Sequence, residues 1–270
     1  MGAKQCAILK SCDRKICATK TFCLRALGGF QMENISHPQF GPIDFPLMDT
    51  PTMTPLDFHP LTPDQMQARA VEFYAMMRQR HTVRDFSDQA VPRELIETCL
   101  LTAGTAPNGA NLQPWHFVAV EDPTIKRRMR ESAEVEERDF YAHRAPLEWK
   151  EALAPLGTDS SKPFLETAPW LIAIFSVNQR ELPGGRRQQM YYAKESTGIA
   201  TGLLITALHH AGLVTLTHTP SPMNFLNEIL DRPATEKPFL LLVAGYPAEV
   251  AEVPAAATVK KSLHEIATFI

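Results

Sequence analysis

Residues 169–177 read PWLIAIFSV, an almost continuously apolar run that predicts a strand buried on both faces of a sheet. Three further runs rich in apolar and β-branched residues predict strands at 116–120, 213–217 and 238–247. Helical patterns fall between these strands. The chain is therefore expected to fold as a layered α/β or α+β domain.

The first helix is marked by its cap. Thr62, Pro63 and Gln65 have the spacing of a capping box with proline at the first helical position. Apolar residues at helical spacing follow this cap and are expected to bury one face of the helix: Met66, Ala70, Phe73, Tyr74 and Met77.

Proline and aspartate open the later helices, and the chain is expected to form one domain with two arms. Further helices are predicted from Pro92, from Asp122-Pro123, over about 187–211 and around 224–230. The segment 144–163 is expected to be irregular because prolines interrupt it. We expect an N-terminal extension over 1–60, a domain over 61–270 and a C-terminal arm over about 249–270.

Composition excludes several classes of protein. The formal net charge is -3 and the pI is about 6.3, so no basic excess is present to bind nucleic acid. No apolar run reaches the length of a membrane span, and a soluble cytoplasmic protein is expected. Four of the five cysteines lie in the first 23 residues, in a spacing that matches no zinc signature, and no metal site is expected. His209 and His210 are adjacent in a helix and face different directions, which makes them a poor metal pair.

Standard catalytic motifs are missing from the sequence, which favours chemistry supplied by a cofactor. The stretch RHTVRDF at 80–86 is one candidate site, because Arg80 and Arg84 would share a face on a helical turn with Thr82 between them. Two guanidiniums and a hydroxyl suit a phosphate. The alternative is a solvated helix end whose dipole the cations compensate.

Two other stretches carry polar groups of interest. THTP at 217–220 follows a predicted strand and is either a hydroxyl-bearing site or a strand end rich in threonine. Glu137 and Tyr141 are four residues apart, hence on one helical face, and Glu137 alone is most simply a surface charge.

Taken together, the motifs resemble the FMN-dependent nitroreductase superfamily, and within it the iodotyrosine deiodinase branch. The resemblance covers residues from about 75 to 264. It is carried by RHTVRDF, TAGTAPNGANLQPWHF, FLETAP, AGLVTLTHTP and RPATEKPFLLLVAGYP, in that order along the chain. It implies an α+β nitroreductase-like fold, with a central mixed sheet flanked by helices, in an intertwined homodimer.

The resemblance also implies roles for residues around the flavin. Arg80, His81, Thr82 and Arg84, with Lys260 or Lys261, would hold the phosphate and ribityl end of FMN. The loop with Pro107, Asn108 and Asn111 would border the isoalloxazine ring, as would Thr217 and His218. Thr219 would donate a hydrogen bond to flavin N5 and is the expected catalytic residue.

The substrate implied by the resemblance is a halogenated tyrosine. Glu137 would bind its ammonium group, Lys162 and Tyr141 its carboxylate, and the backbone at Ala110 its phenolate, under a lid at about 130–163. The implied activity is reductive dehalogenation to tyrosine and halide, with NAD(P)H supplying electrons directly or through a reductase. One alternative is a general NAD(P)H-dependent nitroreductase or quinone reductase, and another is a non-catalytic flavin-binding protein.

Overall fold

A computed structural model of the chain describes residues 51–270, and the structural statements below concern these residues. The chain divides after Phe58, and residues His59–Ile270 form the second of its two units. All helices and strands described below belong to the second unit. Most of the predicted N-terminal extension lies outside the described residues. Within residues 51–270, no helix is both long enough and apolar enough to cross a membrane.

A four-stranded sheet forms the centre of the second unit, in the order β1-β2-β6-β5. Its strands are β1 (Trp115–Val120), β2 (Trp170–Val177), β5 (Val214–His218) and β6 (Glu236–Gly245). All neighbouring strands are antiparallel. The parallel component of the expected mixed sheet is a single bridge, between Thr82 and Thr215 beside β5. The connections between neighbouring strands are long and carry helices, within 123–167 between β1 and β2 and at Phe225–Ile229 between β5 and β6.

β2 is buried along nearly its whole length, as predicted from PWLIAIFSV. Its alternate side chains enter two separate cores. Leu171, Ala173 and Phe175 pack into one cluster, whereas Ile172 and Ile174 pack into the other. A strand with apolar residues on both faces requires a helical layer on each side of the sheet.

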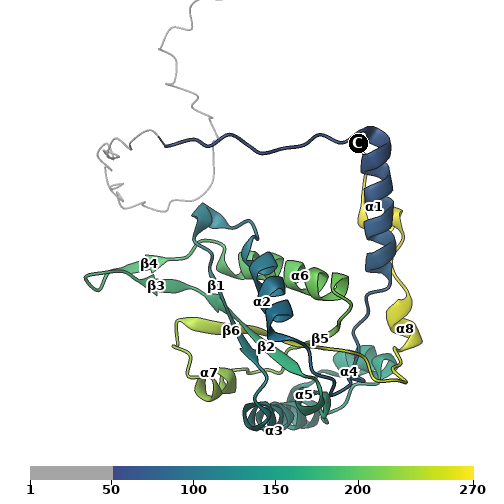
Figure 1. Cartoon of the computed structure of the whole chain (residues 1–270). Coiled ribbons are helices and arrows are strands. Elements are labelled where there is room, and N and C mark those ends of the chain that lie inside the picture. Colours follow the sequence, from purple (N-terminus) through teal and green to yellow (C-terminus); the bar gives the residue numbers. More distant parts are fainter. Residues whose placement is uncertain (1–50) are drawn as a thin grey trace, which may run out of the picture. The chain divides into compact units, whose positions relative to one another are not determined.

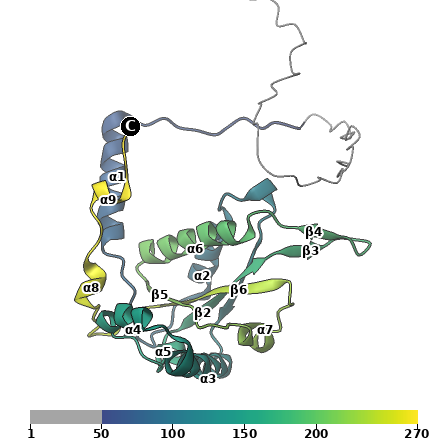
Figure 2. The ribbon, with the colours of Figure 1, turned by 180° about the vertical axis from the view of Figure 1, so that it is seen from behind.

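Helices supply these two layers (Figure 1). One face of the sheet is covered by α2 (Arg93–Gly104) and α6 (Ala193–His210), and the other by α3 (Pro123–Asp139), α5 (Phe164–Thr167) and α7 (Phe225–Ile229). The view from behind shows the same arrangement (Figure 2). The second layer, with the segment between α3 and α5, carries one wall of the candidate site.

Two segments differ from the sequence-based expectation. Residues 144–163 are not irregular throughout, because α4 (Leu147–Leu153) and a 3-10 turn (Ala154–Leu156) lie within them. Pro146 sets the start of α4, and the following LEWKEAL consists mostly of good helix formers. The long helix predicted from 187 begins only at Ala193, because 187–189 form strand β4 paired with β3 (Gln179–Glu181).

α1 (Pro63–Arg78) has the predicted capping box, but its apolar face is not buried within the chain. Met66, Phe73 and Tyr74 are 59%, 53% and 64% exposed, so the expectation of a buried face is wrong for the single chain. The helix is tied to α6 by His209, whose Nε2 lies 2.9 Å from the Met76 carbonyl oxygen.

The C-terminal segment runs beside α1 in both views (Figures 1 and 2). It contains α8 (Ala255–Thr258) and α9 (Leu263–Ile266), and its apolar side chains are also exposed: Val259, Leu263, Ile266, Phe269 and Ile270. Together with α1 it forms an apolar surface with no covering element within residues 51–270.

Candidate active site

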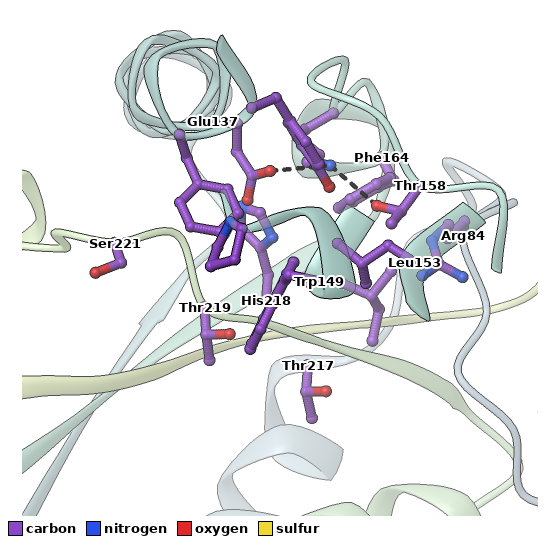
Figure 3. Close-up of a pocket in the computed structure, with 15 residues that line it drawn as sticks. Arg84, Glu137, Trp149, Leu153, Thr158, Phe164, Thr217, His218, Thr219 and Ser221 are labelled. Atoms are coloured by element: carbon purple, nitrogen blue, oxygen red, sulfur yellow. Dashed lines mark hydrogen bonds and ion pairs between the residues drawn. The ribbon is translucent and has the colours of Figure 1, made fainter. Parts of the chain in front are cut away.

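A cavity of about 440 Å³ lies between the end of β5 and the segment from α3 to α5 (Figure 3). Its polar lining includes six residues singled out in the sequence, together with Arg84: Glu137, Tyr141, Lys162, Thr217, His218 and Thr219. The structure therefore brings together three stretches of sequence that are far apart in the chain. Its apolar lining includes Phe140, Pro146, Trp149, Leu153, Phe164 and Leu216.

Glu137 and Lys162 form an ion pair at one wall of this cavity. Lys162 Nζ lies 3.6 Å from Glu137 Oε2, and the two side chains are only 4% and 14% exposed. The ammonium group also donates to the Asp159 carbonyl oxygen and, at 3.4 Å, to Thr158 Oγ1. The Lys162 backbone N–H donates to Glu134 Oε1 at 2.8 Å, which fixes the start of α5 against α3.

Tyr141 follows Glu137 across a change in helix type. α3 ends at Asp139 and continues into a π-turn over Phe140–Arg144, yet both side chains line the same cavity. Their spacing predicted that Glu137 and Tyr141 lie on one helical face, and both do point to the same cavity. We call Glu137, Tyr141 and Lys162 the polar triad.

Burial dominates the electrostatics of the polar triad. It raises the pKa of the Glu137 carboxyl, and the nearby Lys162 ammonium offsets only part of that rise. It lowers the pKa of Lys162 despite the attraction of Glu137, and it raises the pKa of Tyr141. The mutual attraction of the ion pair thus does not recover the full cost of removing both charges from water. A ligand with an added positive and negative charge would supply the missing compensation.

The apolar wall opposite β5 was not identified from the sequence. Trp149 and Leu153 are one turn apart on α4 and face the cavity, and Phe140 contacts Trp149 edge-on with ring centroids 6.1 Å apart. The spacing of Trp149 and Leu153 was a usable signal. It was overlooked because the segment was expected to be irregular. The wall offers a flat apolar surface suited to an aromatic ring.

Arg144 connects this wall to the loop after β5. Its guanidinium donates to the Ser221 carbonyl oxygen at 2.5 Å and pairs with Asp139 at 2.7 Å. The contact with Ser221 joins the two sides of the cavity, because Ser221 follows β5 and also lines the cavity.

The end of β5 presents three consecutive lining residues. Thr217 and Thr219 carry hydroxyl groups at the cavity, as THTP suggested. His218 lies between them, is 6% exposed and packs edge-on against Phe164 with ring centroids 6.1 Å apart. Burial, with a smaller contribution from the Lys162 charge, lowers the pKa of His218 from 6.5 to about 3, so its ring is neutral at physiological pH.

Residues 80–84 lie beside the same strand but are not helical. α1 ends at Arg78, Thr82 bridges Thr215 in parallel, and the Val83 N–H donates to the Thr215 carbonyl oxygen at 3.1 Å. The expected helical turn is wrong because pairing with β5 extends the backbone. Residues two apart in an extended segment point to the same side, so Arg80, Thr82 and Arg84 can still act together.

No carboxylate within residues 51–270 forms an ion pair with Arg80 or Arg84. His81, between Arg80 and Thr82, has a buried Nδ1 with no hydrogen-bond partner among these residues. Two free guanidiniums beside a strand end form a suitable donor set for an anion such as phosphate.

The polar loop at 107–113 contributes no residue to the lining of this cavity. Ala110, Asn111 and Gln113 have positive φ angles of 52°, 52° and 51°, which is uncommon for residues with a Cβ and concentrates at binding sites. Asn108 closes the loop: its Oδ1 accepts from the Gln113 N–H at 2.8 Å. The loop, which includes Pro107, leads into β1, and three strand spacings of roughly 4.8 Å separate that strand from β5.

Lys260 is also not part of the cavity lining. It lies between α8 and α9, is exposed, and donates to the Ala257 carbonyl oxygen at 2.6 Å. The single chain therefore assembles the polar triad, the β5 end and Arg84, but leaves Lys260 and the loop with Ala110 elsewhere.

Comparison with known proteins agrees with this geometry. The model of the nitroreductase family matches residues 77–246, and the chain therefore belongs to the nitroreductase family. This membership confirms the α+β nitroreductase-like fold expected from the sequence.

Relatives within that family are iodotyrosine deiodinases. The chain is 54% identical to the iodotyrosine deiodinase of Haliscomenobacter hydrossis over 192 residues, which is 71% of this chain and 86% of that protein. It is 43% identical to the iodotyrosine deiodinase of Nematostella vectensis over 208 residues, 76% of this chain and 77% of that protein.

A solved structure of oxidised iodotyrosine deiodinase bound to FMN and 3-iodo-L-tyrosine superposes with a TM-score of 0.59. It is 32% identical and covers 66% of this chain and 90% of its own. The resemblance to the iodotyrosine deiodinase branch is thus confirmed.

Proposed function

We propose that this protein is an FMN-dependent reductive dehalogenase that converts halogenated tyrosines to tyrosine and halide. The observation that carries the proposal is the polar triad beside an apolar wall. An ammonium, a carboxylate and a phenol on one wall complement an amino-acid zwitterion, and Trp149 with Leu153 complements its aromatic ring. The relatives, which are named iodotyrosine deiodinases, support the same substrate class.

The residues around the cavity fit FMN. Arg80 and Arg84 provide unpaired guanidiniums for its phosphate, and the orphaned His81 Nδ1 lies in the same segment. Thr217 and Thr219 line the cavity at the end of β5, and the hydroxyl of Thr219 would donate to the flavin ring. The solved relative that binds FMN and 3-iodo-L-tyrosine supports this assignment.

The reaction replaces a carbon–halogen bond by a carbon–hydrogen bond. It consumes two electrons and one proton for each halide ion released, and bound reduced FMN supplies the electrons. The chain's own residues bind and orient the substrate. Glu137 binds its ammonium group, and Lys162 and Tyr141 bind its carboxylate, which ties the α3–α5 segment down over the ring and excludes water.

A homodimer would complete this site. The loop with Ala110 and the exposed Lys260 lie away from the cavity of their own chain, so a second copy is the natural source of these groups. The apolar surface of α1 and the C-terminal segment supports the same conclusion, because contiguous exposed apolar surface of this kind marks an interface. In this arrangement the Ala110 backbone meets the substrate phenolate, and Pro107, Asn108 and Asn111 border the flavin.

NAD(P)H, directly or through a reductase, is the proposed source of electrons, and the cytoplasm stays the expected location. Substrate scope tests the activity against a general nitroreductase. The FMN-loaded, reduced protein should dehalogenate 3-iodotyrosine far faster than it reduces a neutral nitroarene of similar size. Rapid nitroarene reduction without iodide release from iodotyrosine would contradict the proposal.

A further inference from the structure

His218 is a buried polar residue to which neither the fold nor the proposed reaction gives a task for its side chain. It is the last residue of β5, and its ring enters the layer beneath the polar triad rather than lying on the surface. Its Nε2 is enclosed and has no hydrogen-bond partner among residues 51–270. An enclosed polar atom without a partner destabilises a fold, and an apolar residue in its place would avoid that penalty.

The ring's surroundings limit what it can do. Phe164 contacts it edge-on and offers no conventional acceptor. The Lys162 ammonium has three donors, and Asp159, Thr158 and Glu137 already occupy them. A neutral imidazole keeps one N–H and one bare nitrogen. The His218 ring therefore has an N–H to donate, and the hydrogen-bond donors of the neighbouring Lys162 already have acceptors.

The Glu137 carboxylate has unused capacity to accept hydrogen bonds. A carboxylate accepts about four hydrogen bonds, but the Lys162 ammonium at 3.6 Å is the sole partner of the Glu137 carboxylate within residues 51–270. Figure 3 shows the His218 ring rising from β5 toward the Glu137 carboxylate. A donor at this position lies on the β5 side of the carboxylate, whereas Lys162 comes from the segment before α5.

We propose that His218 is a positioning residue for Glu137, and that its Nε2–H donates to the Glu137 carboxylate when a substrate ammonium group binds. This inference rests on the proposed function. When the substrate carboxylate pairs with the Lys162 cation, Glu137 loses its ion pair with Lys162 and turns to the substrate ammonium. His218 then holds the second carboxylate oxygen, so Glu137 stays ionised and correctly aimed although it is buried.

Ligands that carry only one of the two substrate charges test this role of His218. The probes are 3-iodotyrosine, 3-iodotyramine, which keeps only the ammonium, and 3-(4-hydroxy-3-iodophenyl)propanoic acid, which keeps only the carboxylate. Calorimetric titration of the FMN-loaded protein gives their affinities. His218→Leu should weaken the first two by roughly 10- to 100-fold, the range of a hydrogen bond to a charged group, and the acid by less than about threefold. His218→Gln, which keeps a donor at a similar reach, should recover most of the loss.

A double-mutant cycle decides whether the effect passes through Glu137. In the Glu137→Gln background, His218→Leu should cost no further affinity for 3-iodotyramine, whereas in the Lys162→Met background it should keep its full effect. His218→Met serves as a second variant without a donor if the leucine variant does not fold. Equal weakening of all three ligands, or coupling to Lys162 instead of Glu137, would overturn the inference alone. A parent protein that binds no iodotyrosine would overturn the proposed function, and this inference with it.

Discussion

Replacing Lys162 by Met removes the buried cation of the polar triad while keeping a similar unbranched side chain. At the 3.6 Å separation from Glu137, an effective dielectric of about 20 gives a gross attraction of about 4–5 kcal/mol between the two charges. Burial consumes much of this, as the lowered pKa of Lys162 shows. The remaining net contribution to a bound carboxylate is about 1.5–3 kcal/mol, or roughly a 10- to 150-fold change in affinity.

Selectivity between two ligands measures that contribution. The parent should bind 3-iodotyrosine more tightly than 3-iodotyramine, which lacks the carboxylate, and Lys162→Met should remove most of this preference. Affinities from calorimetry on FMN-loaded protein provide the measurement.

Lys126 offers a matched control. It is a second buried lysine, 6% exposed, but its Nζ donates to the Ala168 carbonyl oxygen at 2.8 Å and it does not line the cavity. Lys126→Met should lower the melting temperature without changing the ligand preference. The reasoning is refuted if Lys162→Met weakens both ligands equally, or if Lys126→Met removes the preference as well.

Four further predictions address other parts of the site. Arg84→Ala should lower FMN affinity by at least about tenfold, measured by fluorescence titration of the apoprotein, because a charged phosphate partner is lost. Thr219→Ala should slow iodide release by about five- to tenfold at unchanged FMN content, since one neutral donor to the flavin is removed. Tyr74→Glu should place a charge in the apolar surface of α1, so that light scattering shows a monomer that retains little FMN. Burial raises the pKa of Glu137 above 4.5, so halotyrosine affinity should fall as the pH falls through that raised value, and calorimetry should show no such acidic limb in Glu137→Gln.

The fold could be predicted where the apolar residues of a sequence pattern are buried in the chain's own core. PWLIAIFSV became β2 because apolar residues on both faces need two covering layers, and α2 and α3 begin where Pro92 and Asp122 indicated. The pattern failed where contacts outside the segment decide the structure. Residues 80–84 are extended because β5 offers an unpaired edge, which spacing within the segment does not encode.

The apolar face of α1 shows a different limit. Helical spacing correctly identified the face, but not what covers it, and within the single chain its residues stay exposed. A pattern of hydrophobicity indicates that burial is needed; it does not distinguish the chain's own core from a second copy.

Side-chain direction limited the prediction of the candidate site. Glu137 and Tyr141 were placed on one face by their spacing, and the π-turn between them did not separate them from the cavity. The resemblance implies that His218 borders the flavin, and the structure places His218 in the cavity lining with its side chain buried. Its direction follows from the alternation of β5, in which Leu216 and His218 share a face. Trp149 was missed because α4 was not foreseen.

A single-turnover experiment tests the central claim most directly. Protein loaded with FMN and reduced anaerobically with dithionite, then freed of excess reductant, is mixed with one equivalent of 3-iodotyrosine. The account predicts that each oxidised flavin is matched by one iodide and one tyrosine, because the reaction consumes two electrons per halide. Flavin that stays reduced, or that is reoxidised without iodide and tyrosine in equal amounts, would contradict it.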